Sequence, residues 1–380
     1  MTPDTIARLT RLRHALHQAP ELSGQEEQTA ARIADELRAR GADTVLSGIG
    51  GHGVAGVFDS GQVGPTVAIR CELDGLPIQE QSDAEYVSRN SGKGHLCGHD
   101  GHMVMVLGVA DYLRDNRPRQ GRVVLIFQPA EETGQGAIAY RADPQFAKIA
   151  PDYAFSLHNL PGLALGEVEL CEGPANCASR GMKIVLTGKT SHASAPQDGV
   201  SPAAAMASLM PQLAGLGQGG SMDADFALTT VTHAHLGEPT FGVAPGRAEL
   251  WVTLRTVADE RMQSLIVKAE ALVAKAASDQ GLGFELSYED VFEACMNEPE
   301  AVGILKRSCA EVGVSCTLTG SPQKFSEDFG QFGKDAKAAM FWLGAGTAQP
   351  QLHNPDYDFP DELIPVGTAV FVASLRSLLW

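Results

Sequence analysis

One short stretch of this chain concentrates potential metal ligands. Residues 95–102 read His-Leu-Cys-Gly-His-Asp-Gly-His, which places imidazole, thiol and carboxylate groups close together. These groups are common ligands of divalent transition metals, and close spacing allows one turn to supply several of them. Cys97 and His99 flank a glycine, and both reach one point only if the backbone between them is not helical. We therefore expect Cys97 and His99 to bind metal.

Three residues elsewhere in the chain complete the expected ligand set. Glu132, His158 and His353 each lie at the end of a strand-like run or in a loop near one. Five protein ligands are too many for one tetrahedral ion, but they suit two ions that share a bridging group and a water molecule. The expected cofactor is therefore two divalent metal ions per subunit. A thiolate favours zinc, nickel or cobalt, and the carboxylates leave room for manganese.

Two adjacent carboxylates, Glu131 and Glu132, could divide two tasks between them. At the junction of a strand and a turn, one carboxylate can bind an ion while its neighbour faces a water molecule. Glu131 is then suited to take a proton from this water and return it to a leaving amine. The alternative is a pair of acidic residues at a helix N-terminus, because Gly134 and Gly136 begin an irregular or helical run.

Other residues are candidates for supporting roles. His192, in the turn-rich segment 188–196, could donate a hydrogen bond to an oxyanion, or could be a loop histidine with a local contact. Arg255 ends a predicted strand and could bind a substrate carboxylate, or could be a surface arginine. Asp74 and Asp100 could orient ligand histidines through hydrogen bonds. The histidines interpreted as structural are His14, His17, His233 and His235, with His102 expected to pack in the following helix.

The elements expected to position these residues form an α/β domain. Four short apolar runs are predicted to be strands buried on both faces, as in a parallel or mixed sheet surrounded by helices: 66–71, 122–128, 153–157 and 338–343. In such sheets, ligands bind beyond the carboxyl ends of the strands. Acidic or imidazole side chains directly follow three of these runs, namely Glu72 and Asp74, Glu131 and Glu132, and His158. The sequence therefore predicts a site at this edge.

A second domain is expected to interrupt the first. Between residues 179 and 290 the pattern predicts a βαββαβ order, which is the arrangement of ferredoxin-like domains. Its long helix, 259–280, carries an apolar stripe on one side. We expect a discontinuous domain over residues 1–178 and 292–380, with residues 179–291 inserted as a second, α+β domain.

Composition and charge limit the classes of partner. The formal net charge of −17 argues against nucleic acid or an anionic membrane as the main partner, although a local metal or arginine can still bind a small anion. The seven cysteines are scattered without a CxxC pair, which suits a reducing cytosol. The first residues lack a basic segment followed by an apolar core, and no apolar run approaches membrane-spanning length. We expect a cytoplasmic protein.

Several motifs, taken in order, resemble one enzyme family. The motif of residues 95–102 is followed by Gln-Pro-Ala-Glu-Glu at 128–132, His-Asn-Leu-Pro-Gly at 158–162, the segment 188–196, Glu-Asp-Phe at 327–329 and Leu-His-Asn-Pro-Asp-Tyr-Asp-Phe at 352–359. Together they resemble the M20 metallopeptidase family, in its amidohydrolase branch of hippurate hydrolases, N-acyl-amino-acid deacylases and indoleacetyl-amino-acid hydrolases. The resemblance extends from near Arg8 to the C-terminus.

This resemblance implies a mixed-sheet binuclear metallohydrolase domain with an inserted ferredoxin-like lid or dimerisation domain, and a homodimer or higher homo-oligomer. It implies that Glu131 is the general base, and that His192 helps hold the carbonyl oxygen, sometimes from the partner subunit. Arg255 matches the arginine of a characteristic strand. The resemblance also implies that five residues bind the metal ions: Cys97, His99, Glu132, His158 and His353.

Departures from the family pattern concern the substrate and not the metal. Where the family commonly has Asn-Val-Ile-Pro, residues 242–245 read Gly-Val-Ala-Pro, so a polar contact near the substrate is lost. Leu96 stands where alanine is frequent, and the usual Pro-Gly is missing around 335–338. The expected activity is metal-dependent hydrolysis of an N-acyl amino acid or related small amide. The alternatives are a dipeptidase or carboxypeptidase with the same centre, and a non-catalytic binding protein.

Overall fold

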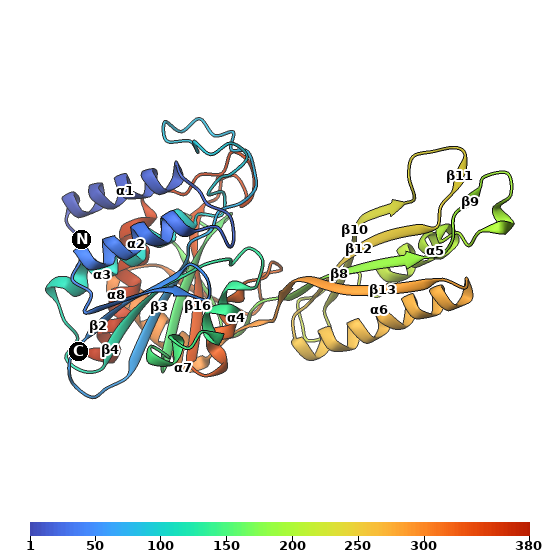
Figure 1. Ribbon diagram of the computed structural model, residues 1–380. Coiled ribbons are helices and arrows are strands. Elements are labelled where there is room, and N and C mark those ends of the chain that lie inside the picture. Colours follow the sequence, from blue (N-terminus) through green and yellow to red (C-terminus); the bar gives the residue numbers. More distant parts are fainter. The chain divides into compact units, whose positions relative to one another are not determined.

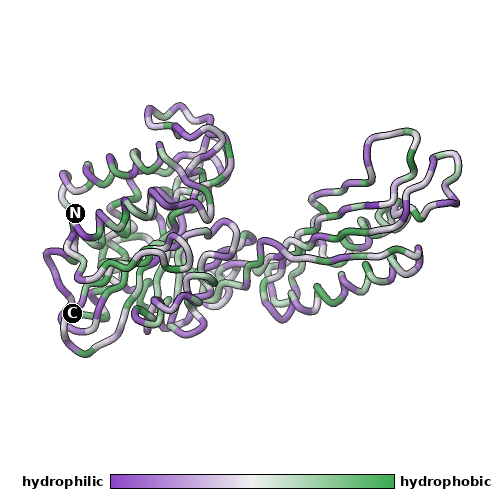
Figure 2. The backbone as a smooth tube through the Cα atoms, in the orientation of Figure 1, coloured by the Kyte–Doolittle hydropathy of each residue, from purple (hydrophilic) through white to green (hydrophobic).

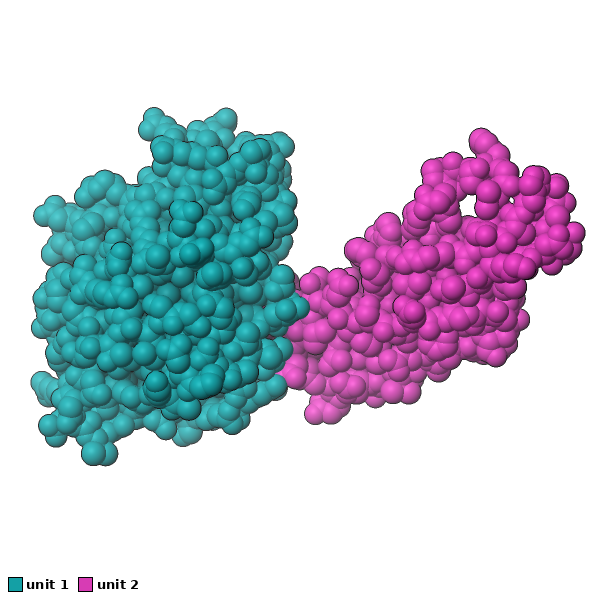
Figure 3. Space-filling view, viewed as in Figure 1, with its two compact units in different colours: residues 1–175, 295–320, 328–380 teal, residues 176–294, 321–327 magenta.

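The computed structural model describes residues 1–380 and divides into two compact units (Figure 3). The larger unit comprises residues 1–175, 295–320 and 328–380, and the smaller unit comprises 176–294 and 321–327. The smaller unit is thus inserted into the larger one. It also includes the short segment 321–327, which was predicted to belong to the larger domain.

A mixed eight-stranded sheet forms the centre of the larger unit, as the fold prediction required (Figure 1). Its strands, in sheet order, are β1 (Thr44–Ile49), β2 (Gly53–Asp59), β4 (Arg122–Gln128), β3 (Thr66–Glu72), β5 (Tyr153–Pro161), β16 (Lys337–Gly346), β6 (Val168–Cys171) and β15 (Cys316–Thr319). The four strands β4, β3, β5 and β16 run parallel to one another, so their carboxyl ends meet at one edge. A two-stranded pair of β7 (Gly173–Asn176) and β14 (Cys295–Asn297) lies outside this sheet.

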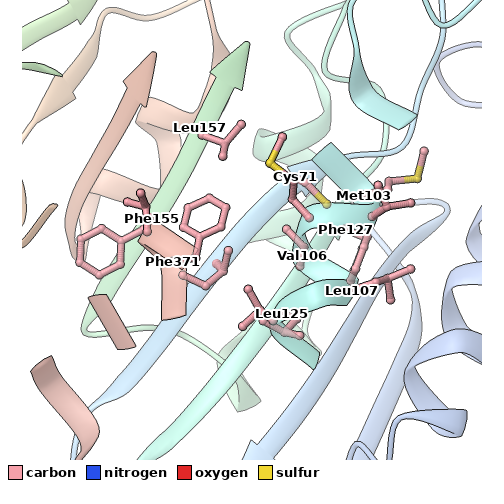
Figure 4. Close-up of a cluster of buried hydrophobic side chains, with 14 of the residues drawn as sticks. Cys71, Met103, Val106, Leu107, Leu125, Phe127, Phe155, Leu157 and Phe371 are labelled. Atoms are coloured by element: carbon pink, nitrogen blue, oxygen red, sulfur yellow. The ribbon is translucent and has the colours of Figure 1, made fainter. Parts of the chain in front are cut away.

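Helices bury the two faces of the sheet unequally. The main core packs the sheet against α1 (Pro3–His17), α2 (Glu27–Ala39), α3 (His99–Asp115), α7 (Pro299–Val312) and α8 (Leu363–Leu379). Figure 4 shows Met103, Val106 and Leu107 of α3 near Phe127 of β4, and Phe371 of α8 near Phe155 of β5. Hydrophobic positions accordingly concentrate inside this unit and hydrophilic ones at its periphery (Figure 2). No helix has both the length and the apolar composition needed to cross a membrane.

The opposite face is covered by shorter elements. These are the helix α4 (Gly136–Ala142) and two short 3-10 helices, Phe146–Lys148 and Asp328–Lys334. Tyr140, Phe146 and Phe332 form an aromatic group there, with ring centroids about 6 Å apart. Beside this group a fully buried arginine, Arg70, projects from β3. A buried charge requires partners of opposite charge or hydrogen-bond acceptors.

The smaller unit is a ferredoxin-like sandwich. Its elements follow the order β8 (Ala178–Thr187), α5 (Ala203–Ala214), β10 (Ala227–Leu236), β12 (Arg247–Thr256), α6 (Asp259–Asp279) and β13 (Gly283–Phe292). The sheet order is β10-β12-β8-β13, and every neighbouring pair is antiparallel. Alternate residues of β8, such as Met182, Ile184 and Leu186, are buried in a core with α5 and α6. A short pair, β9 (Ser191–His192) with β11 (Val243–Ala244), lies outside the sheet, and residues 196–198 form a 3-10 helix.

Candidate metal centre

The five candidate ligands come together at the carboxyl edge of the large sheet. Cys97 and His99 precede and begin α3, Glu132 follows β4, His158 lies near the end of β5, and His353 follows β16. Ligand atoms of these residues form two overlapping groups, Cys97–His99–His158 and Cys97–Glu132–His353, within 4.8 Å in each group. Strand β5 extends to Pro161, so His158 lies within the strand and does not follow it. Residues separated by more than 250 positions thus share one site because parallel strands end together.

Gly98 explains how Cys97 and His99 point to one place. It is the residue before α3 and adopts a left-handed conformation with φ of 91°. Glycine adopts this conformation at little energetic cost, and the chain therefore turns between the candidate ligands Cys97 and His99. Gly98 therefore provides the non-helical backbone that was expected between Cys97 and His99.

Two candidate ligand histidines are oriented by backbone carbonyls. His99 Nδ1 donates to the carbonyl oxygen of Asp74 at 2.9 Å, and His158 Nδ1 donates to that of Asn159 at 2.8 Å. A carbonyl only accepts, so in the neutral rings each Nε2 keeps its lone pair for another partner. The Nε2 of His158 lies 3.4 Å from Cys97 Sγ. The Asp74 carboxylate also lies 3.4 Å from His99. The orienting role of Asp74 stays a prediction.

The two acidic residues lie in a tight turn after β4. Glu131 is buried and Glu132 is partly buried, and each places a carboxylate oxygen 4.0 Å from His99 Nε2. His353 Nε2 lies 3.5 Å from the second oxygen of Glu132. Ala130, before the turn, and His353 both have positive φ, 51° and 66°, which non-glycine residues rarely adopt. Such strain is common where a backbone must present functional groups.

The chemistry of this donor set fits divalent cations. His99 Nε2 is buried and has no hydrogen-bond partner, and 4.0 Å from a carboxylate is a separation that one ion with bonds of about 2.0–2.3 Å can span. Burial opposes a charge on His99, but Asp74, Glu72 and Glu132 outweigh it and raise the pKa of His99 to about 10. Burial and the carboxylates of Glu132 and Glu131 raise the pKa of the Cys97 thiol well above its ordinary value. This cluster of side chains thus favours positive charge, and Cys97 would ionise only beside a cation.

A buried polar network supports the site from behind, and most of it was missed by sequence reasoning. His102, expected only to pack in its helix, contacts Glu72 at 2.6 Å through Nδ1 and the side chain of Asn159 at 2.5 Å through Nε2. Asn159 in turn donates to the hydroxyl of Tyr357 at 2.6 Å. Arg70 forms an ion pair with Glu72 and holds the pKa of that carboxyl well below its usual range, against the opposing effect of burial.

Further partners of Arg70 close this network. It donates to Gln128 at 2.9 Å and to Asp328 at 2.6 Å, and Gln128 donates to Asp328. The sequence did contain one signal of this network. Arg70 lies in the middle of the apolar run 66–71, and a buried charge requires a partner of opposite charge.

Asp100 does not have the role expected for it. Its carboxylate accepts from Arg13 Nε and His17 Nδ1, both at 2.8 Å, and it makes no hydrogen bond to a ligand histidine. Asp100 is the second residue of α3, so its side chain leaves the helix on the side of α1 and away from the cluster around His99. The expectation that it orients a ligand histidine is therefore wrong.

His192 and Arg255 lie in the smaller unit. His192 is exposed, and its Nδ1 lies 2.7 Å from Ser194 Oγ. Its strand pairs with β11, and Ala193 N donates to Gly242 O at 3.0 Å, so the departure from the family pattern at 242 lies beside His192. Arg255 is half-buried and donates to Ser326 Oγ and the carbonyl of Lys324, both at 3.1 Å.

Gly98 offers a direct test of the site's backbone. We expect Gly98→Ala to destabilise the protein by about 1–3 kcal/mol through left-handed strain alone. A further loss should follow because the added Cβ would lie 2.9 Å from Asn159 Cγ and displace that side chain. Urea unfolding of Gly98→Ala and of Gly162→Ala measures both effects. Gly162 has φ of 93° with nothing within 4 Å of an added Cβ, so equal losses in the two variants would contradict the clash.

His17, expected to be structural, sits between two carboxylates. Its Nδ1 lies 2.8 Å from Asp100 and its Nε2 lies 3.1 Å from Glu80. Burial opposes protonation, but these carboxylates outweigh it and raise the pKa of His17 to about 9. The folded-state pKa exceeds the ordinary 6.5, so the stabilisation is complete below pH 6.5 and is lost as the pH rises through about 9.

We therefore expect the stability advantage of the wild type over His17→Asn to shrink between these two pH values. At 1.36 kcal/mol per pKa unit the change is on the order of 3 kcal/mol. Urea unfolding of both proteins across this range measures it. A difference that does not change with pH would contradict the assigned charge on His17.

Comparisons with known proteins show what this chain is similar to. Residues 68–377 match the model of peptidase family M20/M25/M40. The chain is 30% identical to a hippurate hydrolase of Campylobacter jejuni, over 95% of this chain and 94% of the relative, and 27% identical to an N-acetylcysteine deacetylase of Bacillus subtilis, over 96% and 95%. Its fold is similar to the crystal structure of the Bacillus subtilis YxeP protein, a dinuclear metal binding peptidase. That similarity has a TM-score of 0.83 and 26% identity, and covers 100% of this chain and 99% of the other.

Proposed function

Because the chain belongs to peptidase family M20/M25/M40, we propose that it is a metal-dependent amidohydrolase of N-acyl amino acids or related small amides. The products are a carboxylic acid and a free amino acid or amine. The metal centre consists of two divalent ions held by Cys97, His99, Glu132, His158 and His353. Zinc, nickel, cobalt and manganese all suit this mixture of thiolate, imidazole and carboxylate.

One observation carries this proposal. A buried carboxylate, Glu131, stands next to the ligand candidate Glu132 and 4.0 Å from His99, and it is not one of the five proposed ligands. A protein that only binds a metal has no need of such a carboxylate. A hydrolase needs one to move a proton between water and the leaving group.

The residues of the chain then divide the reaction among them. Divalent ions in this site would polarise the amide carbonyl and make water more acidic. Glu131 accepts the proton of the water that attacks the carbonyl carbon. Glu131 then donates this proton to the amide nitrogen, which leaves as an amine. Glu72, His102 and Asn159 form a hydrogen-bonded chain, and the carbonyl of Asn159 accepts from His158, so this chain holds His158 in place during the reaction.

The smaller unit is proposed to contribute to substrate binding. His192 has its Nδ1 beside Ser194, which leaves Nε2 to donate to the carbonyl oxygen of a substrate. The guanidinium of Arg255 is proposed to bind the carboxylate of the amino-acid part. The unit is also the proposed site of dimerisation.

A substrate panel tests the proposed activity. The apoprotein, reloaded separately with zinc, nickel, cobalt or manganese, is incubated with N-acetyl amino acids, N-benzoylglycine and unblocked dipeptides, and products are measured by mass spectrometry. We expect release of free amino acid from the acylated substrates. Cleavage of dipeptides alone would identify a dipeptidase, and full metal loading without turnover would identify a binding protein.

A further inference from the structure

A second buried charge cluster lies beside the metal centre and is not explained by the proposed chemistry. Arg13, in the last part of α1, is fully buried and contacts three carboxylates. Its Nε donates to Asp100 at 2.8 Å, its Nη2 donates to Asp358, and its Nη1 donates to Asp361 at 3.2 Å. One carboxylate would be enough to balance the charge of Arg13, so the other two carboxylates require another explanation.

The carboxylates belong to the two segments that carry metal ligands. Asp100 directly follows the ligand candidate His99 at the start of α3. Asp358 lies five positions after His353, in a stretch between β16 and α8 that has no regular secondary structure. Arg13 thus joins an ordered helix start to an irregular segment through one rigid, planar group.

Other contacts also hold the irregular segment. Tyr357 and Phe359, on either side of Asp358, are buried in the main core, and Tyr357 accepts from Asn159. His353 N donates to Leu96 O at 2.8 Å, and Gln81 N donates to Pro355 O at 2.6 Å. The His353 side chain is 48% exposed, so packing alone does not fix its direction. Tyr86 strengthens the attachment, because its hydroxyl donates to Asp358 at 2.6 Å while its ring lies 4.7 Å from the Arg13 guanidinium carbon.

We propose that Arg13 is a positioning residue of the metal centre, which sets the distance between the segments bearing His99 and His353 through Asp100 and Asp358. This inference rests on the proposed function. A guanidinium suits the task because its fork binds separate carboxylates in fixed directions, whereas an ammonium binds as a point charge. Replacing residues that hold metal ligands in position typically lowers metal affinity by about 10- to 100-fold.

Metal titration of four variants tests this role. Apoprotein is titrated with cobalt(II), with calorimetry to count the ions and the thiolate-to-cobalt absorption to follow Cys97. Arg13→Met should weaken both ions by about 10- to 100-fold. Asp358→Asn should weaken only the ion whose ligands include His353, the same ion that His353→Ala loses. Arg13→Lys, which keeps the charge without the fork, should weaken binding as Arg13→Met does and remains informative if the methionine variant does not fold.

A control on the same helix separates positioning from stability. Arg8 pairs with Asp111 at 2.5 Å, farther along α3, so Arg8→Met should lower thermal stability without changing either cobalt affinity. Wild-type affinities in the Arg13→Lys and Asp358→Asn variants would overturn the positioning role. A wild-type protein that binds no cobalt would instead refute the proposed metal centre.

Discussion

Replacing Glu131 by glutamine is expected to lower kcat for amide hydrolysis by about 100- to 10,000-fold, the usual contribution of a general acid–base residue. Glutamine keeps the size of the side chain but cannot accept a proton from water. Because Glu131 is not one of the five proposed ligands, the metal content should stay at the wild-type level. Steady-state kinetics and elemental analysis of the same preparation measure both quantities.

Glu132→Gln is the matched control for this prediction. The two residues are adjacent and carry the same group, but Glu132 approaches both His99 and His353, at 4.0 Å and 3.5 Å. Its replacement should therefore lower metal content together with activity. Wild-type turnover in Glu131→Gln, or the same metal loss in both variants, would show that the base has been assigned to the wrong residue.

Removal of Cys97 is expected to disrupt the whole centre. Cys97 belongs to both ligand groups, one with His99 and His158 and the other with Glu132 and His353. Replacing a residue that only supports a metal ligand typically lowers metal affinity by about 10- to 100-fold. Cys97→Ala should lower the affinity for both ions by more than this and should abolish hydrolysis. Equilibrium dialysis against each metal measures the affinities.

Cys171 provides the control, because it is also buried in the larger unit but is in neither ligand group. Cys171→Ala should keep both ions and full activity. Retention of both ions in Cys97→Ala would mean that the thiol is not a ligand, and that the imidazoles and carboxylates alone form the site.

The part of the site that the sequence predicted depends on local chemistry and on strand order. Cys97 and His99 are two positions apart, so their types and spacing were visible directly. Glu132 and His353 could be added because apolar runs marked the strands before them, and parallel strands end at one edge. The mixed sheet was predicted correctly from the same apolar runs, and the family was predicted correctly from the motifs and their order along the chain.

What the sequence did not reveal depends on contacts between distant residues. Nothing in the sequence near Arg13 indicates that it meets Asp358, and Asp100 was assigned to the wrong partner because helix direction decides which neighbour it meets. His102 was taken as a packing residue because its partner Glu72 lies 30 positions away. Pairing of buried charges is specified by tertiary packing, which composition and periodicity do not report.

The most direct test of the central claim is anomalous diffraction at the metal absorption edge from crystals of the metal-loaded protein. We expect two anomalous peaks enclosed by Cys97, His99, Glu132, His158 and His353, with Glu131 bound to neither ion. Peaks elsewhere in the chain, or a loaded protein with no peak among these five residues, would contradict it.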